Sequence, residues 1–111
     1  MTGLAAEKRL DGVFHALANR TRRALLDELA ARPARVSELA APHGMSVAAI
    51  SKHLFVLERA GLIRRTRDGN IQSCVLDAGP MADADAWIAG YRRYWAGQID
   101  RLAAFVEKKR R

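Results

Sequence analysis

The most informative part of the chain is Ser46-Val-Ala-Ala-Ile-Ser-Lys-His-Leu-Phe-Val-Leu-Glu-Arg-Ala-Gly-Leu-Ile63. Its first serine is a preferred helix N-cap, because the hydroxyl accepts a hydrogen bond from an amide of the first turn. Apolar residues then recur at helical spacing, at Ile50, Leu54 and Leu57, and Gly61 is a typical helix stop. We therefore predict a helix that runs from the Ser46 cap through Ala60 with one face in the core.

A short helix precedes this one after a tight turn. Val36-Ser-Glu-Leu-Ala-Ala41 favours a helix, and Pro42-His-Gly44 breaks it just before the serine cap. Two helices joined by a short glycine-containing turn form a helix-turn-helix. The outer face of the second helix consists of small or polar residues: Val47, Ala48, Ser51 and Lys52. Such a face fits the major groove of DNA, about 12 Å wide, where bulky or acidic side chains would clash or repel.

Two β-favouring runs follow the helix directly. They are Leu62–Arg67 and Ile71–Leu76, and Asp68-Gly69-Asn70 between them is a strong hairpin signal. A hairpin in this position is the wing of a winged helix. Its arginines are placed to reach phosphates or a minor groove beside the helix: Arg64, Arg65 and Arg67.

Three further helices are predicted around this unit. Residues 5–18 carry an apolar stripe, Asn19 suits the N-cap of a helix that Pro33 ends, and Pro80 suits the start of a long helix over 81–107. Three cations crowd the first turn after the Asn19 cap, where they oppose the helix dipole: Arg20, Arg22 and Arg23. We expect phosphates or carboxylates to compensate them, with salt bridges to Asp27 or to another helix as the alternative.

Length and composition bound the class of protein. The chain has 111 residues, half of them apolar, which suits a single domain over 1–111 with an ordinary core. Cys74 is the single cysteine, so we expect a reducing, cytoplasmic location. Because no apolar run is long enough, we expect no signal peptide and no membrane span. The net charge of +7 is concentrated in residues 20–67, which hold ten basic and four acidic side chains. This distribution predicts a polyanionic partner for the middle of the chain.

Two stretches resemble the ArsR family of winged-helix repressors, and the predicted elements follow the family's order. Phe14-His-Ala-Leu-Ala-Asn-Arg-Thr-Arg-Arg-Ala-Leu-Leu26 is similar to the family's second-helix signature, although Asn-Arg stands where Asp-Pro is usual. Residues 51–63 are similar to its junction of recognition helix and wing. The resemblance implies a dimeric DNA-binding repressor. It also implies that His53 packs against the domain or positions a phosphate, whereas Phe55 replaces a residue that is commonly basic.

The last predicted helix carries more apolar surface than a small soluble domain can cover alone. Aromatic and aliphatic residues recur at three- and four-residue intervals from Trp87 to Val106. We expect part of this stripe to pack on the helix over 5–18 and a second copy of the chain to cover the rest. The helix also resembles the aromatic dimerisation helix of an ArsR branch without an obvious metal site. The predicted dimer contacts are Leu10, Phe14, Trp87, Ile88, Tyr91, Trp95, Leu102 and Phe105.

The sequence indicates neither a metal site nor catalytic groups. The third helix lacks the Cys-x-Cys pair of metal-sensing family members, and no histidine follows His53. Asp11 and His15 are four residues apart, but such pairs are common, so we expect an ordinary helix surface there. Cys74 is interpreted as a small apolar residue, with redox sensing as the alternative. Because no phosphate loop or nucleophile motif is present, we expect no cofactor and no enzymatic activity.

The sequence thus predicts a mainly α (α+β) winged helix-turn-helix with about five helices and a two-stranded β-hairpin wing. The expected function is sequence-specific binding of double-stranded DNA, at an imperfect palindrome, by a homodimeric transcriptional repressor. The alternatives are a winged-helix module that binds protein or RNA, and a metal- or redox-sensing repressor with a non-standard site. A small effector is left open. The predicted DNA contacts are Ser46, Val47, Ala48, Ser51, Lys52, His53, Arg64, Arg65, Arg67 and Asn70.

Overall fold

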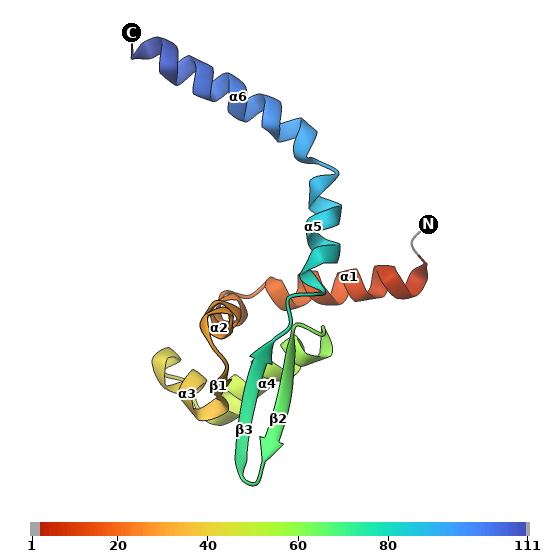
Figure 1. Ribbon diagram of the computed structural model, residues 1–111, viewed down its shortest axis with the longest axis vertical. Helices are drawn as coiled ribbons and strands as arrows, with labels where there is room; N and C mark the ends of the chain where they lie inside the picture. Colours follow the sequence, from red (N-terminus) through yellow and green to blue (C-terminus); the bar gives the residue numbers. More distant parts are fainter. Residues whose placement is uncertain (1–2, 111) are drawn as a thin grey trace.

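The computed structural model describes residues 3–110 (Figure 1). Met1, Thr2 and Arg111, which the predicted domain over 1–111 includes, lie outside the described residues. The elements are α1 (Leu4–Leu17), α2 (Arg20–Ala31), β1 (Ala34–Arg35), α3 (Val36–Ala40), the 3₁₀ helix η1 (Ala41–His43), α4 (Val47–Arg59), β2 (Ile63–Asp68), β3 (Ile71–Leu76), α5 (Met81–Ala89) and α6 (Arg92–Lys109). This order confirms a mainly helical winged helix-turn-helix, with six α-helices in the described part of the chain.

Local signals place the ends of the two central helices where the sequence predicts them. The Asn19 side chain accepts a hydrogen bond from the amide of Arg22 at 3.0 Å, and Ser46 Oγ accepts one from the amide of Ala49 at 3.1 Å. Helix α4 ends at Arg59, and two residues later Gly61 has a φ of 77°, in the left-handed region. The amide of the next residue, Leu62, then donates to the carbonyl of Leu57 at 3.0 Å, which closes a Schellman-type helix end.

The wing belongs to a three-stranded antiparallel sheet with the order β1-β3-β2. Asp68 pairs with Ile71, so Gly69 and Asn70 form a two-residue turn, and the φ of 63° at Gly69 suits that hairpin. The sequence analysis missed β1, because a two-residue strand is too short to show an alternating pattern. β1 ties the wing to the segment between α2 and α3.

The core lies between the helix-turn-helix and the sheet. Ile50, Leu54 and Leu57 of α4 are fully buried, which confirms the predicted inward stripe of that helix. They pack in one cluster with Leu25 of α2 and Leu62 before β2, together with buried residues of α1 and α3. Because these contacts fix α4 and the wing relative to one another, the opposite face of α4 is presented on a rigid support.

The segment predicted as one helix over 81–107 is divided into two helices, which corrects the sequence interpretation. α5 ends at Ala89 and α6 begins at Arg92. Between them the amides of Gly90 and Tyr91 donate to carbonyls three residues earlier, at 3.2 and 2.9 Å, instead of four. Glycine costs about 1 kcal/mol relative to alanine inside a helix, which favours a break at Gly90, although α1 and α6 continue through Gly12 and Gly97. The apolar stripe continues across the break and therefore did not reveal it.

Helix α6 extends away from the winged body, and the chain is elongated (Figure 1). The radius of gyration is 18.5 Å, compared with about 13 Å for a compact chain of this length. Every residue of α6 is exposed, whereas α5 packs on α1 and the Phe14 and Trp87 rings meet edge to face at 5.7 Å. No helix within residues 3–110 is long and apolar enough to cross a lipid bilayer.

Candidate nucleic-acid interface

The face of α4 opposite the core is open to solvent. Four residues at three- and four-residue spacing form this outward stripe: Ala48, Lys52, Phe55 and Arg59. The first two were predicted as DNA contacts, and the last two were not. The spacing alone places all four on one face. The outward stripe carries two cations and no carboxylate, which suits an anionic partner.

The two other predicted α4 residues of this region, Val47 and Ser51, lie on the flank of the helix toward the wing. They line a groove of about 240 Å³ whose opposite wall is the hairpin turn with Asn70. Arg35 and Gln72 also line this groove and were missed by the sequence analysis. Both residues are brought to the groove by the pairing of β1 with β3, in which Arg35 lies opposite Ser73, the neighbour of Gln72. The sequence alone does not show this pairing. No carboxylate lines the groove.

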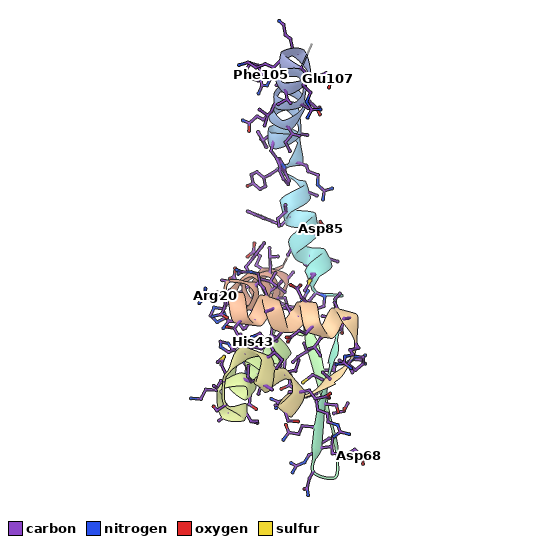
Figure 2. The ribbon with its side chains drawn as sticks, turned by 90° about the vertical axis from the view of Figure 1, so that its left-hand side faces the viewer. Arg20, His43, Asp68, Asp85, Phe105 and Glu107 are labelled. Atoms are coloured by element: carbon purple, nitrogen blue, oxygen red, sulfur yellow. The ribbon has the colours of Figure 1, made fainter. Side chains whose placement is uncertain are left out.

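The strand register separates the three predicted wing arginines onto two faces. Arg65 and Arg67 share the face of the buried Ile63, because side chains two residues apart in a strand point the same way. Arg64 points to the opposite face. The Arg65 guanidinium donates a hydrogen bond to Gln72 Oε1 at 2.8 Å, and Arg67 Nε donates to the carbonyl of Gly69 at 3.1 Å. Both bonds hold cations close to the wing tip, where Figure 2 labels Asp68 at the end of the molecule opposite Phe105 of α6.

Two of the crowded arginines at the start of α2 are compensated by backbone carbonyls. Arg22 donates from Nε to the Ala16 carbonyl at 2.8 Å and from Nη2 to the His15 carbonyl at 2.9 Å. Arg23 donates to the Leu17 carbonyl at 2.7 Å. These carbonyls are the negative end of the α1 dipole, so the last turn of α1 replaces the phosphates or carboxylates that the sequence analysis expected. These hydrogen bonds form because α1 folds back against α2, which the sequence analysis did not predict.

His53 lies on the α4 flank that faces α2, away from the outward stripe. Its Nδ1 is 3.4 Å from Arg22 Nη1, and its side chain is half-buried. Burial, then the Arg22 guanidinium and His43, lower the pKa of His53 below its ordinary value of 6.5. The imidazole is therefore held in its neutral form at neutral pH. This position suits a residue that orients α4 against α2, and a DNA contact at His53 stays a prediction.

This environment predicts a pH dependence of stability. Because folding favours neutral His53, the unfolded chain takes up the proton first, and the stabilisation is lost as pH falls below about 6.5 toward the lowered pKa. Substituting His53→Asn keeps an acceptor near Arg22 without a titrating ring. We expect the free energy of unfolding of wild type to fall more steeply than that of the variant between about pH 7.5 and 5, measured by urea unfolding. Parallel curves would contradict the assignment.

The remaining polar residues singled out by the sequence do not gather into a site. Cys74 is fully buried, and burial raises the pKa of its thiol, so it packs as a neutral core residue. His43 Nε2 lies 3.3 Å from Glu28 Oε2. Within residues 3–110 no three histidine, cysteine or acidic side chains come together in a way that could hold a metal ion, and Asp11 and His15 are both on the surface of α1.

Comparison with known proteins places this arrangement in a family. Residues 17–66, from the end of α1 to the first strand of the wing, match a family model described as a helix-turn-helix domain. The HTH-type transcriptional regulator Rv2034 of Mycobacterium tuberculosis is 32% identical over 99 residues, which cover 89% of this chain and 90% of that protein.

Two solved structures share the fold. The crystal structure of the ArsR family transcriptional regulator RHA00566 matches with a TM-score of 0.77 and 38% identity over 86% of this chain and 97% of that one. The homodimeric winged helix-turn-helix DNA-binding domain of Mb0332 from Mycobacterium bovis matches with a TM-score of 0.64 and 27% identity, over 83% and 87% of the two chains. On sequence and fold together, the chain belongs to the ArsR family of winged helix-turn-helix transcriptional regulators, DNA-binding proteins that control transcription.

Proposed function

We propose that this regulator is a homodimeric repressor, which seats α4 in the major groove of an imperfect palindrome and rests its wing on the flanking backbone. The observation that carries the proposal is the outward stripe of α4, which is exposed and cationic on a helix whose Val47 and Ser51 flank lies beside the wing. A helix of this kind fits the major groove, and cations on a neighbouring hairpin fit phosphates.

Roles are proposed residue by residue. Lys52 and Ser51 contact base edges in the major groove. Ser46, Val47 and Ala48, at the N-terminal end of α4, contact the same groove of the DNA. Arg65 and Arg67 contact phosphates from one face of the wing and Arg64 from the other, while Asn70 approaches the backbone at the turn. Arg22 and His53 keep α4 at its angle to α2. The middle of the chain, with its excess of basic residues, thus supplies the electrostatic part of the affinity.

The proposed dimer interface is the apolar surface of α1, α5 and α6. Of the predicted contacts, Leu10 and Phe14 are half-buried on α1, and the other six are exposed: Trp87, Ile88, Tyr91, Trp95, Leu102 and Phe105. A stripe this long is unusual on the surface of a soluble monomer. The similar domain of Mb0332 is a homodimer. A two-fold pair would place two α4 helices about 34–36 Å apart, one turn of DNA, so the operator would be palindromic.

We propose a cytoplasmic location, because a transcriptional repressor of the bacterial type acts on DNA in that compartment. A family of DNA-binding regulators also makes a binding role, without catalysis, the simplest proposal for this chain.

Base readout and backbone contact are distinguishable by mutation. On an operator selected from random duplexes, Lys52→Ala is expected to weaken binding by about tenfold or more while random DNA loses much less. Arg67→Ala is expected to weaken both DNAs equally and to reduce the slope of log K against log salt by about one. Fluorescence anisotropy over a salt series measures both quantities.

The control is Lys108→Ala at the end of α6, which removes the same charge far from α4. Its affinities and salt slope should equal those of wild type. Equal losses for Lys52→Ala and Arg67→Ala on both DNAs would contradict base readout by α4.

A further inference from the structure

An exposed phenylalanine with an arginine above it stands at the C-terminal half of the outward stripe. The side chain of Phe55 is 53% exposed, and the Arg59 guanidinium carbon lies 5.8 Å from the centre of its ring. An exposed ring beneath a cation restricts where that cation points, because the guanidinium is attracted to the ring face. Nothing in the core requires either residue at this position.

A basic groove runs beside this pair, between α4 and α1. Phe55 and Arg59 form its wall on α4, Lys8 and Gly12 line it from α1, and its volume is about 530 Å³. It continues past Arg59 into a second hollow of about 560 Å³, where Arg9 and the single carboxylate of Asp83 are among the lining residues. A Cβ at Gly12 would meet no atom within 4 Å, so the α1 side of the groove is open. The groove therefore combines an apolar ring with an excess of cations.

The position of the groove indicates what it holds. Arg59 lies seven residues after Lys52 on the same stripe, about 10 Å further along the helix axis. The major groove is about 12 Å wide and is bordered by phosphates on both sides. If Lys52 reaches base edges, Arg59 arrives at the border, where the ligand is a deoxyribose-phosphate strand. A sugar offers an apolar face to a ring, and a phosphate offers oxygens to a guanidinium and an ammonium group.

We infer that Phe55, Arg59 and Lys8 form a second backbone-binding site, which holds the sugar-phosphate strand bordering the major groove of each half-site. Arg59 and Lys8 contact phosphates, and Phe55 packs on the sugar and fixes the direction of Arg59. The inference rests on the proposed seating of α4 in the major groove. It extends the protein–DNA contact from the helix-turn-helix and wing onto α1.

The test is the salt dependence of binding to the selected operator and to random duplex DNA. Arg59→Gln and Lys8→Gln are each expected to lower the salt slope by about one, the double variant by about two, with equal weakening on both DNAs. Phe55→Leu removes the ring and is expected to reduce the contribution of Arg59, so that Arg59→Gln changes the slope less when it is combined with Phe55→Leu than when it is made alone. Phe55→Tyr keeps the ring, so Arg59→Gln is expected to change the slope as much in the Phe55→Tyr background as it does alone.

Lys108→Gln, with the same charge change on α6, is the matched control and should leave the slope unchanged. Circular dichroism and sedimentation of each variant confirm that fold and assembly are intact. An unchanged slope in both Arg59→Gln and Lys8→Gln, with wild type still specific for its operator, overturns the second site and leaves the proposed function standing. Absence of operator preference in wild type would overturn the proposed function and the inference together.

Discussion

Substituting Leu102→Asp is expected to convert the dimer into a folded monomer and to lower operator affinity by about 100-fold or more. Leu102 is 63% exposed on α6, so a charge there costs the isolated chain little. In a dimer that covers the apolar stripe, the same carboxylate would be buried without a partner, at a cost of several kcal/mol. Since each 1.4 kcal/mol is about a factor of ten, a cost of about 3 kcal/mol or more weakens dimerisation by about 100-fold or more. Light scattering measures the assembly, and anisotropy measures the affinity.

Ala104→Asp is the control, because residue 104 lies on the opposite side of α6 from residue 102. It introduces the same charge and should leave the dimer and its DNA affinity intact. Two results would show that α6 has been misassigned: a wild-type chain that is monomeric at micromolar concentration, or Leu102→Asp that stays dimeric with full operator affinity.

Leu54→Ala in α4 is expected to lower the free energy of unfolding by about 2–5 kcal/mol, through lost apolar burial and the cavity left behind. Leu54 is fully buried in the central cluster, and its neighbour by two positions, Lys52, is exposed. Lys52→Ala should therefore change stability by less than about 0.5 kcal/mol while it weakens operator binding. Chemical denaturation at a fixed protein concentration measures both, since a dimer's stability depends on concentration.

Comparing Leu54→Ala with Lys52→Ala distinguishes a residue that stabilises the fold from one that binds DNA. A loss below about 1 kcal/mol for Leu54→Ala would show that α4 is not anchored by its inward stripe. A destabilisation of Lys52→Ala as large as that of Leu54→Ala would show that the outward stripe is part of the core instead of a binding face.

The central elements and the family could be predicted from local sequence signals. The ends of α4 follow from Ser46 and Gly61, and the wing turn follows from Gly69, because each signal acts through hydrogen bonds or backbone angles within a few residues. The buried stripe of α4 follows from the period of its apolar residues. None of these features needs knowledge of any distant part of the chain.

The contacts between these elements could not be predicted in this way, because they join distant parts of the chain. β1 exists because the segment after α2 pairs with β3, and the Arg22 side chain reaches the carbonyls of α1 because α1 folds back against α2. The break at Gly90 directs α6 away from the body, although the apolar stripe continues through it. The groove between α1 and Arg59 likewise joins residues about fifty positions apart. Local periodicity fixes which face of an element is apolar, but the partner of that face is chosen by packing across the whole chain.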